Sequence, residues 1–550
     1  MTSRIDPREI YSLFNTAHSH MRPSDQAHVT DVELREGVVP IVFVPGVMGS
    51  NLEHTGGEGK WVLNWEGSGA AWLFRGPKER HTILDPDNTQ VYPNGDISKG
   101  LELNRYLTHK EYPGLYHGLP GLPYRTQREL QKRRVDRVMR ARGWGEVAKM
   151  SYGDFLVWLE NTLNAEAAAL PQLQQSLSRQ MARLLQDSAG VSAGDAADAA
   201  GRAAQALARF HFPVHACGYN WLRSNKVSAE ETLAQRVDEI ISGYRQAGMR
   251  CQRAILVTHS MGGLVARYYS EVHRGRDNLW GIAHGVMPTI GAAVFYRRMK
   301  CGTDGDPVIA RVLGADAPAM TAVLARAPGP LELLPTPEYG AGWLKIHRDG
   351  ELVCSLPIAG APYNDIYLVR DQWWSMLEVE LANPDYAEEK DPEKARKMLD
   401  EAWEQYSSII NDKVKDFHQK TAQKFHPTTY LFYSASDEHP SYGTVAWHGE
   451  PYQQRYYPGG GAPVSVQQYR GERLHQETNA RGQATTYHYR ISEYDEPGDA
   501  TVPARSASAG SEASRRRLIV NTEHEAAYKN HDAQMFTLLA ILEIAGEIPQ

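Results

Sequence analysis

Short apolar runs that end in turn residues alternate along the chain with segments of helical periodicity. Residues 38–44 form a continuous apolar and largely β-branched run that breaks at Pro45-Gly46. A run that is apolar on both faces is typical of a strand buried in a parallel sheet. Similar runs predict further strands at 212–218, 254–257, 279–283 and 428–433.

Helical patterns follow several of these strands. Ser228-Ala-Glu-Glu231 has the spacing of a capping box, which predicts a helix start at Ser228. The apolar residues that then recur at helical spacing are Leu233, Val237, Ile240, Ile241 and Tyr244. Further helices are predicted at 264–272 and 533–544. Strands that alternate with helices predict an α/β fold with a doubly wound, mostly parallel sheet.

Three long segments interrupt this alternation. Residues 51–140 are rich in Gly, Pro and aromatic residues, and residues 154–210 are rich in Ala, Leu and Gln and are predicted to be helical. Residues 364–425 contain an amphipathic helix, from Ala395 to Phe417. Its apolar stripe fits packing on the body of the protein better than a mobile cap over an active site, but both interpretations remain open. We therefore expect an N-terminal arm at 1–37 and one catalytic domain at 38–550 with helical cap insertions.

Composition narrows the class of protein. With 42% hydrophobic and 23% charged residues, the 550-residue chain has an ordinary globular composition. A formal net charge of −7 argues against a nucleic-acid binder, which needs a basic surface. The chain contains four cysteines, which form no CxxC pair, so isolated thiols are predicted in place of a zinc site or a disulfide framework: Cys217, Cys251, Cys301 and Cys354.

No targeting or membrane-spanning segment is predicted. The N-terminal residues lack the apolar stretch of a signal peptide, and no run of about 18 apolar residues occurs. We expect synthesis in the cytoplasm, and any action elsewhere would require another route of delivery.

The strand predicted at 254–257 runs directly into Thr258-His-Ser-Met-Gly-Gly263. A serine between a strand and a helix, with small residues beside it, is the pattern of a nucleophile elbow. Glycine usually stands where this chain has Thr258. A serine N-cap is the simpler alternative. The apolar strand before Ser260 and the two glycines after it favour the nucleophile.

A serine nucleophile needs a base and a group that orients the base, and in this fold they follow in the order Ser, Asp or Glu, His. Two acids compete: Asp437, just after the strand at 428–433, and Asp499, in Gly498-Asp-Ala-Thr-Val-Pro503. Two histidines near the C-terminus, His524 and His531, compete for the base. The residue pattern alone leaves both choices open.

Several segments together resemble the lecithin:cholesterol acyltransferase-like lipases. The run Val-Pro-Gly-Val-Met-Gly-Ser-Asn-Leu at 44–52 is similar to their oxyanion loop, and Gly-Tyr-Asn-Trp at 218–221 is similar to their Gly-Tyr-Asp-Trp element, with Asn220 in place of Asp. Their segment ending in Leu-Leu-Pro has a counterpart at 314–335, and 498–503 resembles their Gly-Asp-Gly-Thr-Val motif. The tail from His524 through residue 540 is similar to bacterial lipase effectors delivered by type VI secretion.

The resemblance implies an α/β-hydrolase with Ser260 as nucleophile, Asp499 as acid and His524 as base. The oxyanion donors expected are the backbone N–H of Met261, the residue after the nucleophile, and that of Met48, with Val47 as second choice for the latter. No metal or organic cofactor is expected. The implied substrate is a glycerophospholipid, and Trp373-Trp374 is a candidate for either lipid contact or core packing.

The function expected is that of a serine lipase or phospholipase that acts at a membrane surface as an antibacterial type VI effector. The partners expected are a secretion spike protein, which would carry the chain into the periplasm of a target cell, and an immunity protein. Nucleic acid is not expected as a partner. Two alternatives remain: a cytoplasmic carboxylesterase or acyltransferase acting on another ester, and an inactive α/β-hydrolase scaffold that serves as a binding module.

Overall fold

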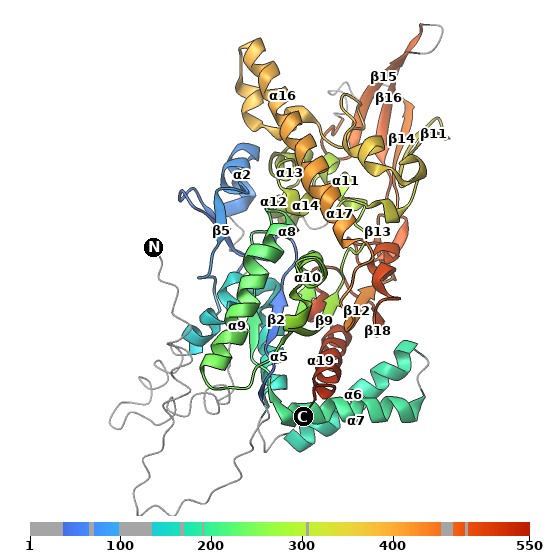
Figure 1. The fold of residues 1–550 in the computed structure, drawn as a ribbon. Coiled ribbons are helices and arrows are strands. Elements are labelled where there is room, and N and C mark those ends of the chain that lie inside the picture. Colours follow the sequence, from blue (N-terminus) through green and yellow to red (C-terminus); the bar gives the residue numbers. More distant parts are fainter. Residues whose placement is uncertain are drawn as a thin grey trace, which may run out of the picture.

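A computed structural model describes residues 37–64, 71–97, 135–165, 170–189, 192–303, 307–452, 466–478 and 482–549. The centre of the molecule is a six-stranded sheet in the order β18-β12-β9-β8-β2-β7, and every neighbouring pair in it is parallel (Figure 1). Its strands are β2 (Ile41–Val44), β7 (Val214–Ala216), β8 (Ala254–His259), β9 (Leu279–Gly285), β12 (Thr429–Ser434) and β18 (Arg516–Val520). The protein is thus a mixed α/β fold with a mostly parallel sheet.

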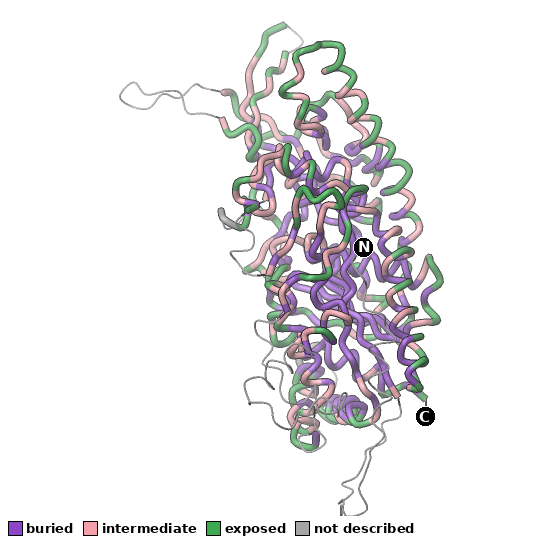
Figure 2. The backbone as a smooth tube through the Cα atoms, turned by 90° about the vertical axis from the view of Figure 1, so that its left-hand side faces the viewer, coloured by how far each residue is buried: buried purple, intermediate pink, exposed green. Residues whose placement is uncertain are grey.

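Helices cover both faces of this sheet. Alternate residues of a strand point to opposite faces. On β9, Gly281 faces Ile544 of α19 (His531–Gly546), whereas His284, on the other face, meets Gly263 of α10 (Gly262–Glu271). This three-layer arrangement buries the sheet, so β8 and β12 are buried along their whole length, within the buried interior of the molecule (Figure 2).

Most predicted elements of the sheet occur within a few residues of the expected bounds, but one helix begins earlier than predicted. Ser224, and not Ser228, is the N-cap: its Oγ accepts the N–H of Lys226 at 3.2 Å. The helix runs from α8 (Asn225–Val227) through a π-helical segment (Ser228–Leu233) into α9 (Ala234–Gln246). Ser228 therefore lies inside the helix, because Ser224, one turn earlier, already caps its first turn.

The segment expected to be helical at 154–210 forms the end of α5 (Lys149–Leu163) and a hairpin of α6 (Leu170–Ala189) and α7 (Ala193–Arg209). The amphipathic stripe at 395–417 lies on α16 (Pro392–Ser408), which continues through a π-helical segment (Ile409–Val414) into α17 (Lys415–Thr421). The C-terminal part of this stripe is buried, from Tyr406 through Ile410 and Val414 to Phe417. Residues 65–70 and 98–134 of the insertion expected at 51–140, and all but the last residue of the arm expected at 1–37, lie outside the described residues.

A second sheet that the sequence did not reveal lies at the end of the molecule that also carries α16 (Figure 1). It has five strands in the order β11-β10-β14-β16-β15. They are β10 (Leu344–Arg348), β11 (Glu351–Leu356), β14 (Val445–Pro451), β15 (Glu472–Thr478) and β16 (Ala484–Ile491). Lys300 of α11 (Val294–Cys301) and Arg473 of β15 both pair with Glu378, at 2.7 and 2.6 Å. These buried ion pairs tie the second sheet to the helices beside the central sheet.

Shorter elements complete the fold. The small sheets contain β1 (Gly37–Val38) with β6 (Phe210–His211), β13 (Ser436–Ser441) with β17 (Glu496–Gly498), and β3 (Leu52–His54) between β4 (Lys60–Trp61) and β5 (Thr89–Val91). The remaining α-helices of the described ranges are α2 (Pro77–Ile83), α12 (Pro307–Leu313), α13 (Ala317–Leu324), α14 (Pro328–Leu331), α15 (Val379–Ala382) and α18 (Ala504–Ala507).

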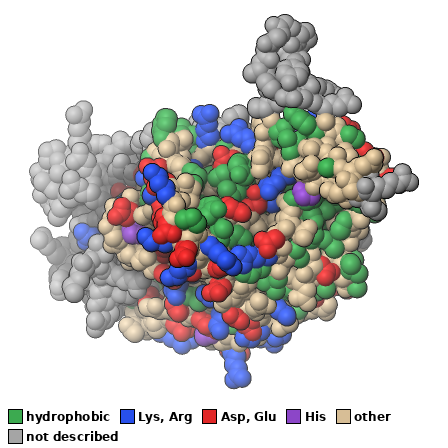
Figure 3. Space-filling model, turned by 90° about the horizontal axis from the view of Figure 1, so that it is seen from above, with side chains coloured by type: hydrophobic (Ala, Val, Ile, Leu, Met, Phe, Trp, Pro, Cys, Tyr) green, Lys and Arg blue, Asp and Glu red, His purple; other side chains and the backbone are tan. Residues whose placement is uncertain are grey.

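The outer surface is mixed in character. Seen from the end that carries α16 and the second sheet, acidic, basic and hydrophobic side chains are interspersed, and neither sign of charge dominates the described part of this face (Figure 3). All four cysteines are free thiols. None of the helices in the described ranges has the length and hydropathy needed to cross a bilayer.

Candidate active site

Ser260 occupies a strained turn between β8 and α10. Its φ is +52°, a left-handed conformation that costs a residue with a side chain about 1 kcal/mol or more. The turn is possible because its neighbours are small: a Cβ on Gly262 would lie 2.4 Å from the carbonyl oxygen of Val44. A Cβ on Gly263 would lie 2.5 Å from Sδ of Met287. The strand–turn–helix context therefore projects the serine above the end of the sheet, the geometry of a nucleophile elbow.

Three side chains that are far apart in the sequence form a hydrogen-bonded chain at this turn. The Oγ of Ser260 is 2.8 Å from Nε2 of His524, and Nδ1 of His524 is 2.7 Å from Oδ2 of Asp499. The carboxylate accepts from Nδ1–H, which leaves Nε2 free to accept the serine proton. The arrangement can deprotonate Ser260 as the serine attacks an electrophilic carbon.

Hydrogen bonds from both its side chain and its backbone fix the position of Asp499. Its side chain is buried, and its Oδ1 accepts the backbone N–H groups of Thr501 at 3.0 Å and Val502 at 2.6 Å. Its own N–H donates to Oγ of Ser441 at 3.2 Å, and its carbonyl accepts the N–H of His524 at 2.9 Å. One carboxylate oxygen is thus held by the loop, and the other is directed at the imidazole.

The competing acid and base lie elsewhere. Asp437 is exposed on β13, and no hydrogen bond joins it to Ser260 or to either histidine within the described ranges. His531 is the first residue of α19, where its Nε2 lies 3.2 Å from Oε1 of Gln180. The structure brings Asp499 and His524 to Ser260 and leaves Asp437 and His531 apart from it.

The loop after β2 lies directly against the elbow. A Cβ on Gly46 would be 3.0 Å from Cβ of Ser260. The N–H of Gly46 donates to Tyr152, whereas those of Val47, Met48 and Met261 have no acceptor among the described residues. The N–H groups expected as oxyanion donors, in the loop beside Ser260 and on the residue that follows it, are therefore unpaired among the described residues.

Two departures from the lipase pattern are accommodated by specific contacts. The hydroxyl of Thr258, in place of the usual glycine, hydrogen bonds to Nδ1 of His284 at 2.8 Å. The amide nitrogen of Asn220 donates to the carbonyl oxygens of Pro86 and Thr89, at 3.1 and 3.0 Å. A carboxylate at position 220 has no proton to donate to those carbonyls, so Asn is the residue that fits.

Two residues at the site were not identified from the sequence: Tyr152 and His259. Both are buried, and their side chains hydrogen bond to each other at 3.0 Å. Burial, with a smaller contribution from the charge on His524, lowers the pKa of His259 to about 3, so the ring is neutral at ordinary pH. The signal in the sequence was the place of His259 directly before Ser260. Tyr152, 108 residues upstream of Ser260, had none.

Trp373 and Trp374 are partly buried and pack against the hydrophobic core. The Trp373 ring stacks on that of Tyr489, with centroids 4.2 Å apart, and meets the edge of Trp447. The carbonyl of Trp374 accepts the hydroxyl of Tyr296 at 2.8 Å. These contacts favour core packing over lipid contact as the role of the two tryptophans.

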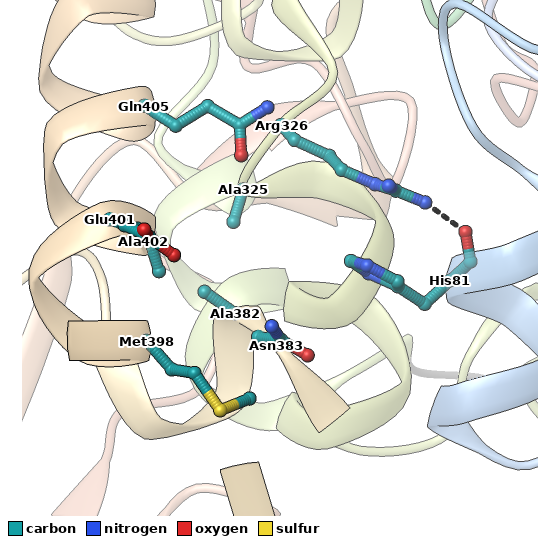
Figure 4. A pocket seen from close by; sticks show the side chains of 9 residues that line it. All are labelled: His81, Ala325, Arg326, Ala382, Asn383, Met398, Glu401, Ala402 and Gln405. Carbon is teal, nitrogen blue, oxygen red and sulfur yellow. Dashed lines mark hydrogen bonds between the residues drawn. The ribbon is translucent and has the colours of Figure 1, made fainter. Parts of the chain in front are cut away.

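A separate cavity of about 160 Å³ lies between α2, α13, α15 and α16 (Figure 4). It is lined by His81, Ala325, Arg326, Ala382, Asn383, Met398, Glu401, Ala402 and Gln405. Arg326 donates to the carbonyl of His81 and pairs with Asp85, so its guanidinium braces this wall of the cavity. None of Ser260, Asp499 and His524 lines it, and the described residues hold no cluster of three or more His, Cys, Asp and Glu placed to bind a metal.

No family model and no curated protein matches the sequence. A solved structure, described as the crystal structure of the Tle4–Tli4 complex, contains a chain with a similar fold. The two chains share 24% sequence identity, the TM-score is 0.66, and the match covers 93% of this chain and 99% of that one. At this identity the similarity establishes a common fold over almost the whole chain.

Proposed function

We propose that this protein is a serine ester hydrolase of the α/β-hydrolase fold that cleaves acyl esters of glycerophospholipids. The observation that carries the proposal is the hydrogen-bonded chain Ser260–His524–Asp499, with distances of 2.8 and 2.7 Å, on a left-handed turn between a strand and a helix. A serine in this setting has the base it needs, and the base has the acid that orients it.

The proposed reaction passes through an acyl-enzyme. His524 takes the proton of Ser260 as Oγ attacks the ester carbonyl, and Asp499 stabilises the imidazolium that forms. The developing oxyanion accepts the N–H of Met261 and one from the 45–49 loop, for which we propose Met48. His524 then donates its proton to the departing glycerol oxygen. Water, activated by the same histidine, attacks the acyl-enzyme and releases a fatty acid.

The setting proposed is that of an antibacterial type VI effector. The sequence resemblance of the tail beginning at His524 supports it, and so does the fold shared with a chain of the Tle4–Tli4 complex. That structure is a complex of two proteins, which supports an immunity protein as a partner of this chain as well. The proposal also includes a secretion spike protein as carrier and a target-cell membrane, reached from the periplasm, as the place of action.

The test is fatty-acid release from phosphatidylethanolamine–phosphatidylglycerol vesicles by the purified chain. We expect release by the wild type and a loss on the order of a million-fold in Ser260→Ala. His524→Ala should lose activity to a similar extent, whereas His531→Ala should retain it. Cleavage of a short soluble ester without release from vesicles would instead indicate the carboxylesterase alternative.

Growth measurements test the effector role separately. Expression with an added periplasmic signal should arrest growth of a sensitive bacterium, and Ser260→Ala should relieve the arrest. Equal growth of both strains at verified expression would contradict the effector role while leaving the hydrolase activity intact.

A further inference from the structure

Three segments of the site are joined by a continuous chain of buried hydrogen bonds. Nε2 of His259 lies 2.8 Å from the backbone carbonyl of His524, and Nδ1 lies 3.0 Å from the hydroxyl of Tyr152. The hydroxyl oxygen of Tyr152 lies 3.3 Å from the backbone N of Gly46. The chain therefore runs from the loop after β2, through the residue that precedes the nucleophile, to the backbone of the base.

The partners fix the direction of every bond. A carbonyl only accepts, so Nε2 of His259 carries the proton and donates to His524. The neutral ring then accepts at Nδ1, which requires the Tyr152 hydroxyl to donate to it. The same hydroxyl oxygen accepts the N–H of Gly46. Each of the three protons, on Nε2 of His259, on the Tyr152 hydroxyl and on the nitrogen of Gly46, thus has one acceptor, which gives the network a single arrangement.

The network is in close contact with the loop after β2, so a small displacement of either would disturb the other. A Cβ on Gly46 would be 2.8 Å from Nδ1 of His259, and a Cβ on Gly49 would be 2.7 Å from the Tyr152 hydroxyl. The whole 46–49 turn is thus folded around the Tyr152 hydroxyl and against the elbow. Tyr152 is held in turn by Phe43 of the neighbouring strand β2, with ring centroids 4.8 Å apart.

The backbone of His524 is held from two sides. Its N–H donates to the carbonyl of Asp499 at 2.9 Å, and its carbonyl accepts from His259 at 2.8 Å. The first contact sets the distance between base and acid, and the second sets the distance between base and elbow. The side-chain distances in the Ser260–His524–Asp499 chain depend on this placement of the His524 backbone.

We propose that Tyr152 and His259 are positioning residues that hold the oxyanion loop and the catalytic histidine in register with Ser260. This inference rests on the function proposed above. Neither residue exchanges a proton with substrate. Tyr152 acts on the oxyanion loop through Gly46, and His259 acts on the base through the His524 carbonyl. Misplacement of reacting groups by about 1 Å can lower turnover roughly 100-fold.

The test measures kcat and KM for a short soluble p-nitrophenyl ester, together with Tm and the rate at which a fluorophosphonate labels Ser260. Tyr152→Phe keeps the ring and deletes the hydroxyl. We expect kcat and the labelling rate to fall about 10- to 100-fold with KM within about twofold. The matched control is Tyr244→Phe, which deletes a buried tyrosine hydroxyl 3.1 Å from Nε2 of His215, outside this network. It should lower Tm to a similar extent and leave kcat unchanged.

A second pair of variants separates positioning from general destabilisation. In His259→Gln the amide nitrogen reaches the place of Nε2 and can still donate to the His524 carbonyl, whereas in His259→Asn the shorter side chain stops at the place of Nδ1. We expect His259→Gln to retain at least about tenfold more kcat than His259→Asn. This pair also carries the test if Tyr152→Phe does not fold.

The outcomes are distinct. Equal kcat in Tyr152→Phe and Tyr244→Phe, or equal kcat in the two His259 variants, would overturn the positioning role while the hydrolase activity stands. A wild type that neither cleaves the ester nor is labelled at Ser260 would overturn the proposed function, and the positioning role with it.

Discussion

At the scale of single residues, the site depends on the hydrogen-bond partner of each polar side-chain atom. Oδ1 of Asp499 is engaged by two backbone N–H groups, so only Oδ2 is free to accept from His524. The imidazole in turn has a single tautomer in which it can take the serine proton. These hydrogen-bond partners support the roles that the resemblance implied for Asp499 and His524.

Asp499→Asn tests this assignment. The Asn oxygen should remain with the Thr501 and Val502 N–H groups, which turns the amide NH₂ toward Nδ1 of His524. The imidazole then carries its proton on Nε2 and cannot accept one from Ser260. We expect kcat for ester hydrolysis to fall about 10⁴-fold with the fold intact. Asp437→Asn makes the same change in the competing acid, and a comparable loss there would contradict the assignment.

At the scale of elements, the elbow depends on the close approach of α10 and the end of β2. The carbonyl oxygens of Val44 and Pro45 would lie 2.4 and 2.5 Å from a Cβ on Gly262. Backbone atoms cannot move aside as the end of a flexible side chain can. The requirement for glycine therefore comes from the packing of a helix on a strand.

Gly262→Ala is accordingly expected to destabilise the protein by about 1–3 kcal/mol and to lower esterase activity, because α10 must shift away from β2. Gly201→Ala is the matched control: Gly201 lies inside α7, and a Cβ there would meet nothing within 4 Å. The control should stabilise the protein by up to about 1 kcal/mol through helix propensity. Denaturant unfolding of both variants distinguishes the effects, and a neutral Gly262→Ala would refute the packing argument.

At the scale of the whole molecule, buried ionisable groups link stability to pH. Glu332 is fully enclosed where α14 meets the start of α8, and it accepts from the Ser224 hydroxyl at 2.6 Å and the Asn225 N–H at 2.8 Å. Burial raises the pKa of Glu332 to about 8, although its hydrogen bonds oppose the shift. The folded protein therefore holds this carboxyl in its neutral form at pH values where the unfolded chain ionises it.

The sign of the effect follows from linkage. Stability from Glu332 is complete below about pH 4.5, the ordinary pKa of a glutamate, and is lost as the pH rises to about 8. Glu332→Gln cannot ionise. Its amide oxygen can accept the N–H of Asn225, and its NH₂ can donate to Oγ of Ser224 once the serine hydroxyl turns away. We expect this substitution to raise Tm by about 2–5 °C at pH 8 and to leave Tm nearly unchanged at pH 4.5. The exposed Glu338→Gln should show no such difference, and a pH-independent effect of Glu332→Gln would contradict the argument.

The hydrophobic pattern of the chain predicted the central strands, because a strand buried on both faces is mainly apolar, as residues 254–257 are. It did not reveal the second sheet. The strand β16, Ala-Thr-Thr-Tyr-His-Tyr-Arg-Ile, is polar and half exposed, so its pairing with β14 and β15 left little hydrophobic signal. The start of the helix at Ser224 was also missed, because two serines four residues apart are equally good caps until the chain path is known.

The sequence by itself determined the nucleophile candidate and its turn, since the apolar strand, Ser260 and two glycines are all local. The residue pattern left Asp437 and His531 in competition, and the resemblance favoured Asp499 and His524; only the tertiary structure shows that these two lie beside Ser260. Only the structure revealed Tyr152 and His259. The physical reason is the separation along the chain of the residues that interact. A strand or a turn is specified by residues that are neighbours in the sequence. A hydrogen bond between residues 264 positions apart depends on where the sheet and its loops place their backbones.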